Sequence, residues 1–286
     1  MRDDTPSRTA QWVAAARGLG MLLPDDVRVA DDPYGLAFTS TRLAALLAER
    51  GPKGLAALPG MRTWIVYMQI RTKLLDDAVR RFVEDGGDQV VLLGAGFDCR
   101  ALRLPELADA TVFEVDHPAT QGHKQATLAR LEIDSPAHYV TWDFETRPLD
   151  ELGDALVDAG HDPARPTLTI WEGVTMYLTE TAIDASLRAI AEWSAPRSLL
   201  AMTYFSKSRL TTPSLATRIV RAAVATLGEP FKWGTSPDEL EPFLDERGWT
   251  VIDDISMQEA AAKLMPPDLA RSVRSADSRV ALAVRR

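Results

Sequence analysis

The sequence of 286 residues contains little cysteine and little histidine, which excludes several kinds of site. Its one cysteine, Cys99, can form no disulfide within the chain and cannot build a cage of thiolate ligands around zinc. The four histidines, at positions 117, 123, 138 and 161, show neither HxxxH nor HExxH spacing. We therefore expect no metal site in this protein.

An excess of basic residues and a long apolar run are also missing. The net charge is −9 and the pI is about 5.0, which argues against a broad electrostatic footprint for nucleic acid or anionic lipid. No apolar run reaches the roughly 18 residues of a membrane span, and residues 1–7 contain no apolar signal region. We expect a cytoplasmic protein without nucleic-acid or membrane partners, and the sequence leaves its oligomeric state open.

The composition that is present is typical of a globular protein. Hydrophobic residues make up 46% of the chain and charged residues 26%. A single domain of this length buries roughly three quarters of the surface that its unfolded chain exposes. We therefore expect a large core that needs no covalent or metal crosslinks.

The chain divides near residue 87 into a helical part and a part where short β-rich runs alternate with helical runs. Strands are expected at 89–93, 111–115, 138–141, 167–171, 198–204, 249–255 and 279–284. Helices are expected at 9–23, 42–50, 61–83, 118–131, 149–159, 180–193 and 237–247, with no clear helix between the last two strands. This alternation predicts βαβ units and a doubly wound, mostly parallel α/β sheet.

We interpret residues 1–286 as a single domain with four parts. These are a helical N-terminal part at 1–87, a core at 88–204, an insertion at 205–236 and closing strands within 237–286. A long insertion directly after a strand of such a sheet is the best candidate for a lid over a substrate.

A positive charge lies on the apolar face of the helix expected at 61–83. Arg71 follows Met68 by three residues and precedes Leu75 by four, which places it on the apolar stripe. An unpaired charge on a buried face is unfavourable, so Arg71 needs an anionic partner. The alternatives are a pairing with Asp76 or another acid, or an extension of the side chain to solvent.

The sharpest local feature is a glycine turn that directly follows an apolar strand. The turn reads Gly94-Ala95-Gly96, and glycines there let the backbone turn tightly and approach a ligand closely. Cys99 occupies the third glycine position of the dinucleotide fingerprint, and Asp98 would repel a pyrophosphate at the helix N-terminus. The turn therefore favours a nucleoside ligand without phosphates. The alternative is a tight turn that binds no ligand.

Acidic residues stand at the end of the second expected strand. Asp116 follows the glycines by about 20 residues, where a carboxylate typically holds ribose hydroxyls, and Glu114 lies on the same face of the strand. Capping of the next helix is the alternative, because Pro118 suits a first helical position and Asp116 or His117 could be the cap.

Two more strands end in acidic residues. Asp143 could accept from an adenine amino group with Phe144 packed near the ring, and a solvated turn aspartate is the alternative. Glu172 directly follows a buried strand and could meet the cationic end of a cofactor, with an ordinary loop acid as the alternative.

These features together resemble the leucine carboxyl methyltransferase family, including its bacterial polyketide O-methyltransferases. The resemblance covers nearly the whole chain. The matching stretches are QVVLLGAGFDCRALR at 89–103, VFEVDHPATQGHK at 112–124, WEGVTMYL at 171–178, Arg71-Thr72 and, more loosely, 228–249. It implies a class I methyltransferase, with a Rossmann-like sheet of seven strands, N-terminal helical additions and a helical lid, that uses S-adenosyl-L-methionine.

The resemblance also implies roles for single residues. The arginine matching Arg71 pairs with the methionine carboxylate of the cofactor, and the acid matching Glu172 lies near its amino group. The turn at Gly94, Ala95 and Gly96 lies beneath the cofactor. Asp116, with Glu114 beside it, matches the ribose-binding position, and Asp143 and Phe144 match the adenine-binding positions. Arg8 matches a further basic contact loosely, and Cys99 replaces the threonine that is commonest in bacterial members.

The sequence says less about the methyl acceptor. Candidates for its pocket are Tyr177, Tyr204, His117 and Trp233, and no residue stands out as a general base. The insertion at 205–236 mixes apolar residues (Phe205, Leu210, Phe231 and Trp233) with basic ones (Lys207, Arg209 and Lys232). This mixture suits an apolar acceptor that carries an acid group.

Three classes of function follow. The favoured one is an O-methyltransferase for a carboxylate or hydroxyl of a small molecule. The second is a methyltransferase for the C-terminal carboxylate of a protein, which would require a cleft open to a peptide. The third is a nucleotide-dependent oxidoreductase or a non-catalytic nucleoside-binding protein, and the missing third glycine argues against the oxidoreductase.

Overall fold

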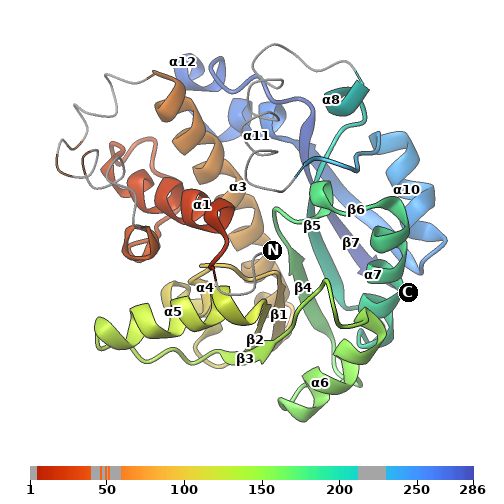
Figure 1. The fold of residues 1–286 in the computed structure, drawn as a ribbon. Coiled ribbons are helices and arrows are strands. Elements are labelled where there is room, and N and C mark those ends of the chain that lie inside the picture. The colour runs from red at the N-terminus through yellow and green to blue at the C-terminus, as the bar shows by residue number, and fades with distance from the viewer. Residues whose placement is uncertain (1–4, 40–45, 47–48, 50, 52–58, 212–229) are drawn as a thin grey trace.

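A twisted sheet of seven strands forms the centre of the computed structural model, which describes residues 5–39, 46, 49, 51, 59–211 and 230–286 (Figure 1). The strands are β1 (Gln89–Leu93), β2 (Thr111–Asp116), β3 (His138–Thr141), β4 (Thr167–Trp171), β5 (Leu199–Phe205), β6 (Trp249–Ser256) and β7 (Ser278–Arg285). Their order across the sheet is β3-β2-β1-β4-β5-β7-β6. Strands β1 to β5 are parallel, and β7 runs antiparallel between β5 and β6.

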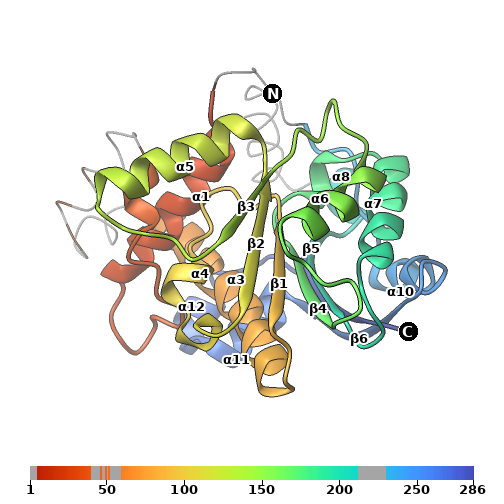
Figure 2. The same ribbon diagram turned by 90° about the horizontal axis from the view of Figure 1, so that it is seen from below.

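Helices cover both faces of this sheet (Figure 2). One face carries α1 (Arg8–Leu19), α3 (Pro59–Glu84), α4 (Arg100–Arg103), α5 (Pro118–Arg130), α11 (Met257–Leu264) and α12 (Pro267–Ala270). The other carries α6 (Leu152–Asp158), α7 (Glu180–Glu192) and α10 (Pro237–Asp245). Short helical turns are η1 (Gly20–Leu22), η2 (Gly35–Phe38), η3 (Pro105–Leu107), η4 (Leu149–Glu151), η5 (Thr175–Tyr177) and α8 (Ser208–Thr211). The predicted doubly wound α/β fold is confirmed.

The strand order places a switch point between β1 and β4. From β1 the chain moves outward through β2 to β3, and then returns to the other side of β1 as β4. Connections leave the carboxyl ends of β1 and β4 in opposite directions, which opens a crevice there. The fold therefore puts the glycine turn after β1 and Glu172 after β4 at one edge of the sheet.

All seven expected strands begin and end within one residue of the observed bounds. The expected helix at 9–23 ends earlier as an α-helix, at Leu19, and continues as the turn η1. The helix expected at 42–50 lies largely outside the described residues. Among the described residues, no helix is both long and apolar enough to cross a membrane.

The expectation of no helix between the last two strands is wrong, because α11 and α12 lie there. The start of α11 has a local signal: the Ser256 hydroxyl accepts from the Glu259 N–H, and the Glu259 carboxylate accepts from the Ser256 N–H. This reciprocal capping box is readable from the Ser-x-x-Glu spacing. Met257, Ala260 and Ala261 then bury the inner face of α11 in the core cluster that contains α3.

Candidate active site

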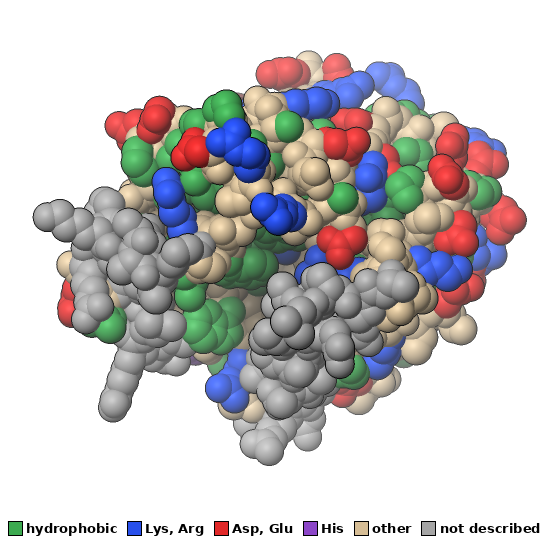
Figure 3. Space-filling view, turned by 90° about the horizontal axis from the view of Figure 1, so that it is seen from above, with side chains coloured by type: hydrophobic (Ala, Val, Ile, Leu, Met, Phe, Trp, Pro, Cys, Tyr) green, Lys and Arg blue, Asp and Glu red, His purple; other side chains and the backbone are tan. Residues whose placement is uncertain are grey.

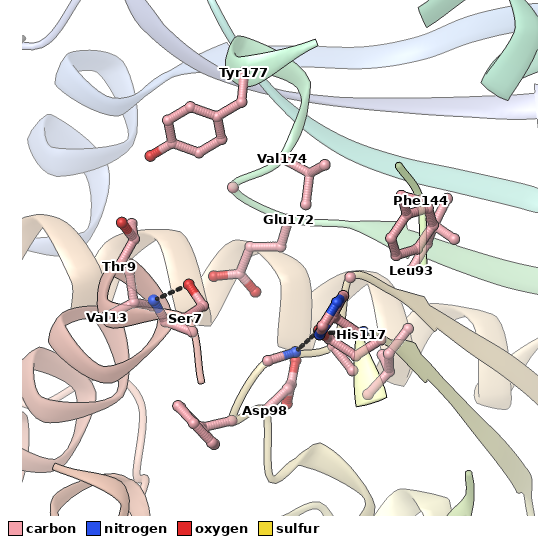
Figure 4. Close-up of a pocket in the computed structure, with 18 of the residues that line it drawn as sticks. Ser7, Thr9, Val13, Leu93, Asp98, His117, Phe144, Glu172, Val174 and Tyr177 are labelled. Carbon is pink, nitrogen blue, oxygen red and sulfur yellow. Dashed lines mark hydrogen bonds between the residues drawn. The ribbon is translucent and has the colours of Figure 1, made fainter. Parts of the chain in front are cut away.

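A cavity of about 380 Å³ opens at the carboxyl ends of β1, β2 and β4, within the range of small-molecule pockets. The space-filling view shows the molecule hollowed there, with apolar side chains deep in the hollow (Figure 3). Helix α1 forms one wall with Ser7 before it, and η5 forms another. In the close-up, Glu172 lies between Asp98 and Tyr177, which stand on opposite sides of it (Figure 4).

The glycine turn after β1 forms the floor of the cavity. Gly94 has φ +73° and Gly96 has φ +54°, a region that side chains disfavour. The N–H groups of Gly94 and Ala95 both donate to the carbonyl of Val115, at 2.9 and 3.0 Å, and bind the turn to β2. A Cβ on Gly94 would stand 2.7 Å from Val174 Cγ2 across the cavity. The structure thus brings predicted residues of the turn to the cavity and shows why glycine is needed there.

Asp116, at the end of β2, is held directly against this turn. Its Oδ2 accepts from the Gly96 N–H at 2.5 Å, and its Oδ1 accepts from the His117 N–H at 2.6 Å. Burial raises the pKa of Asp116, and these two hydrogen bonds oppose the shift. The cap of α5 is His117, whose Nδ1 accepts from the Ala119 N–H. Asp116 is therefore not the helix cap, and each of its oxygens keeps a lone pair for a ligand hydroxyl.

Arg71 and Glu172 meet inside the cavity although they are 101 residues apart. Arg71 Nε and Nη2 lie 2.8 and 2.7 Å from Glu172 Oε1, and Arg100 Nη1 donates to Glu172 Oε2 at 2.9 Å. Burial alone would raise the pKa of Glu172, but the charges of Arg71 and Arg100 hold it well below its usual range. Glu172 is therefore ionised at neutral pH and presents a fixed carboxylate next to a guanidinium.

A network of buried charges supports this pair from below. Arg100, which is 1% exposed, also pairs with Asp98 and Asp76, and Arg103 binds the same Asp76. With Arg17 and Asp32 included, four arginines (17, 71, 100 and 103) face four carboxylates (32, 76, 98 and 172). Buried ion pairs of this kind keep their geometry because breaking one leaves an uncompensated charge.

Arg17 is a cavity residue that the sequence analysis missed. It lies on α1, pairs with Asp32 at 2.8 Å and donates to the Phe97 carbonyl at 2.6 Å. Arg17 could have been found in the same way as Arg71, because it follows Val13, a residue of the apolar face of this expected helix, by four residues. Arg8, the loosely matched basic residue, is exposed and does not line the cavity.

Glu114 requires a correction, because it does not reach the cavity. It is 2% exposed and forms an ion pair at 2.5 Å with Lys124 of α5. Lys124 also donates to the Asp98 carbonyl. Glu114 shares a face with Asp116 but lies two residues deeper in the sheet, where the neighbouring helix neutralises it. Its place is in the support of the loop after β1.

Asp143 and Phe144 line the cavity beyond β3. Asp143 accepts from the Glu145 N–H at 2.9 Å and from the Thr146 hydroxyl at 2.8 Å, which lowers its pKa. It therefore stabilises the turn, as the alternative reading expected, and still faces the cavity. The ring of Phe144 is 37% exposed and borders the same end of the cavity.

The acceptor-pocket candidates are divided by the structure. Tyr177 and His117 line the cavity, whereas Tyr204 and Trp233 do not. Tyr204 is 1% exposed and its hydroxyl donates to Asp254 of β6 at 2.7 Å. Both Tyr204 and Trp233 belong to the core cluster on the α7 and α10 face of the sheet. Their inclusion was wrong because their side chains point into that core.

Most of the expected lid at 205–236 lies outside the described residues, which stop at 211 and resume at 230. The described ends of this segment lie together, because the Thr235 N–H donates to the Phe205 carbonyl at 3.0 Å. Pro230 and Lys232 line the cavity. The segment thus returns to the carboxyl end of β5, next to the crevice.

Comparison with known proteins finds relatives that match most of this chain. The family model described as leucine carboxyl methyltransferase matches residues 10–191. A protein of Frankia alni is 32% identical to this chain over 270 residues, and the match covers 92% of this chain and 89% of that protein. A protein of Mycobacteroides abscessus is 32% identical over 269 residues, and the match covers 89% of this chain and 84% of that protein. Both carry the name "Putative S-adenosyl-L-methionine-dependent methyltransferase".

Two solved structures show the same fold. A DUF574 family protein of Streptomyces avermitilis aligns with a TM-score of 0.57 and 17% identity over 95% of this chain and 97% of its own. A protein of Thermobifida fusca, described as a "putative methyltransferase", aligns with a TM-score of 0.57 and 19% identity over 94% and 97%. The likeness covers almost the whole of each chain.

Proposed function

Because this chain belongs to the leucine carboxyl methyltransferase family and is an S-adenosylmethionine-dependent methyltransferase, we propose that it methylates an oxygen atom of a small-molecule acceptor. One observation carries the proposal. A single cavity joins the strand-end residues expected at the cofactor to Tyr177 and Lys232, which stand on the acceptor side.

The methionine end of the cofactor belongs at Arg71 and Glu172. An α-amino acid carries an ammonium and a carboxylate on one carbon, and the site offers a guanidinium and a carboxylate whose Nη2 and Oε1 atoms lie 2.7 Å apart. Arg71 Nη1 has no acceptor among the described residues, so it can donate to a ligand carboxylate. Glu172 keeps its charge for the ligand ammonium.

The nucleoside end belongs between the glycine turn and β3. The turn at Gly94, Ala95 and Gly96 supplies a floor without side chains beyond one methyl group, and Asp116 stands beside it with lone pairs for two ribose hydroxyls. Asp143 and Phe144 border the far end, where a planar base would be bound. This order along the cavity is the order of the parts of S-adenosylmethionine.

When bound, S-adenosylmethionine would supply an electrophilic sulfonium methyl group for an acceptor oxygen. The protein must hold the acceptor in line with the bond from sulfur to this methyl group and exclude water. Helix α1 covers the glycine turn, since a Cβ on Gly96 would stand 3.2 Å from Ala10 Cβ. We assign the selection of the acceptor to the segment 205–236. In this proposal the chain is one domain with four parts, at 1–87, 88–204, 205–236 and 237–286.

Titration calorimetry with S-adenosylmethionine, with NADPH as the control ligand, tests the cofactor site. We expect micromolar binding of S-adenosylmethionine and at least tenfold weaker binding by Asp116→Asn, which keeps the shape of the side chain but removes its charge. A screen for release of S-adenosylhomocysteine then compares small acids and phenols with a peptide that has a free C-terminal carboxylate. Turnover of the peptide alone would contradict the small-molecule proposal, and binding of NADPH alone would contradict the site.

A further inference from the structure

We propose that Lys232 binds the carboxylate of the methyl acceptor, and that the acceptor therefore pairs an aromatic or aliphatic body with an acid group. The inference deepens the proposed function and rests on it. It is carried by the charge of Lys232 and by the apolar surface at Tyr177, Val174 and Leu178 on the acceptor side of the cavity.

Three cations line the cavity, and two of them are neutralised. Arg17 pairs with Asp32 at 2.8 Å, and Arg71 pairs with Glu172 at 2.7 Å. Lys232 is exposed and has no acidic partner within the described ranges 5–39, 59–211 and 230–286. A ligand anion at Lys232 would therefore meet a positive charge that the protein itself leaves uncompensated.

The backbone fixes Lys232 beside the acceptor side of the cavity. The Lys232 N–H donates to the Met176 carbonyl at 2.7 Å, and the Trp233 N–H approaches the same oxygen at 3.4 Å. Met176 belongs to η5, so the base of the lysine side chain stands next to Tyr177. The carboxylates that line the cavity belong to other elements: the loop after β1, the ends of β2 and β4, and the turn after β3.

One aromatic ring of the cavity wall, that of Tyr177, stands beside this lysine, and two further rings pack behind it. The Tyr177 and Phe231 ring centroids lie 5.7 Å apart, and those of Phe231 and Phe205 lie 5.1 Å apart. Of these three rings, only that of Tyr177 lines the cavity, where Val174 and Leu178 add further apolar surface for the body of a ligand. Lys232 therefore stands beside an apolar part of the cavity wall, and Phe231 packs against the Tyr177 ring.

The other basic residues of this segment are engaged. Lys207 pairs with Glu239 at 3.2 Å, and Arg209 pairs with Asp277 at 3.3 Å. The sequence alone did not distinguish these residues from Lys232, because all three follow β5 within one insertion. The structure selects Lys232 because it alone of the three lines the cavity.

The test uses the full chain saturated with S-adenosylhomocysteine and titrated with 3-phenylpropanoate and octanoate, each against its uncharged primary amide. We expect each acid to bind about fivefold tighter than its amide, the size of a partly exposed ion pair. Lys232→Ala should reduce this ratio to one, Lys232→Arg should keep it, and Lys207→Ala should leave it unchanged. Thermal unfolding of each variant confirms that the fold is intact.

The outcomes separate this inference from the proposed function. If S-adenosylhomocysteine binds but the acids bind no tighter than their amides, the role of Lys232 is refuted and the cofactor site stands. The same conclusion follows if neither the acids nor the amides bind. The same holds if the preference survives in Lys232→Ala. If wild-type protein does not bind S-adenosylhomocysteine, the proposed function fails and the inference fails with it.

Discussion

Arg71 provides a sharp test of how the cofactor is oriented. If its guanidinium holds the carboxylate of the methionine moiety, replacing Arg71 by methionine should matter only for ligands that carry that carboxylate. S-adenosylhomocysteine and its decarboxylated analogue form the matched ligand pair. Together with wild type and Arg71→Met they form a thermodynamic cycle whose coupling energy isolates this one contact.

The expected size follows from the contacts. Arg71 Nε and Nη2 are engaged by Glu172, which leaves Nη1 and the open side of Nη2 for the ligand. A hydrogen bond between charged groups contributes about 1.5–3 kcal/mol, so we expect a coupling energy of about 2–3 kcal/mol. This corresponds to a loss of about 30- to 150-fold in affinity for S-adenosylhomocysteine beyond any loss for the analogue.

Titration calorimetry of both ligands gives the four dissociation constants. Arg80→Met is the matched control, because Arg80 lies on the same helix but pairs with Glu106 and does not line the cavity. It should leave the ratio of the two affinities unchanged. An equal loss for both ligands in Arg71→Met would refute the reasoning, because Arg71 would then only maintain the shape of the site through Glu172.

Three further predictions concern the rest of the site. Gly94→Ala should lower the free energy of unfolding, measured in urea, by about 2–4 kcal/mol, because the alanine would have a positive φ and its Cβ would clash with Val174. Adding Val174→Ala should restore part of this loss. If the losses of the two single variants simply add in the double variant, the clash is contradicted. Burial raises the pKa of Cys99 to about 12, so very little of the thiol is present as the reactive thiolate at pH 8. Ellman's reagent at this pH should therefore label the thiol of the folded protein about a thousandfold more slowly than that of the unfolded protein. Equal labelling rates would show that the thiol is accessible in the folded protein. The lowered pKa of Glu172 stabilises the folded state at pH values above 4.5, the ordinary pKa of a glutamate, and this stabilisation is lost as the pH falls. The difference in Tm between wild type and Glu172→Gln should therefore narrow below about pH 4, and a constant difference would contradict this.

The sequence was most informative about elements and their ends. The apolar runs that became β1 and β4 are short, β-rich and buried along their whole length, so their bounds were predictable. Residues directly after parallel strands meet at one edge of the sheet whatever the loops do, which is why the glycine turn, Asp116 and Glu172 were found together. The helix α11 was missed although its capping box was readable.

Residues whose role depends on a partner distant in sequence were predicted less well. Glu114 and Asp116 are both acids on one face of β2, and only the position of Lys124 on α5 separates a buried ion pair from a ligand-facing carboxylate. Tyr204 and Trp233 suited an aromatic pocket by composition, yet the packing of α7 and α10 draws both into the core.

What the sequence by itself determined is the position of the seven strands along the chain, the glycine turn and the need of Arg71 for an anion, because these follow from local periodicity and from the cost of burying a charge. Only the tertiary structure decided which acid meets Arg71, that Arg17 and Arg100 join the same network, and that Lys232 lines the cavity without a partner among the described residues. The physical reason is that the neutralisation of a charge depends on distances of a few ångströms between elements far apart in the chain, and no local pattern encodes those distances.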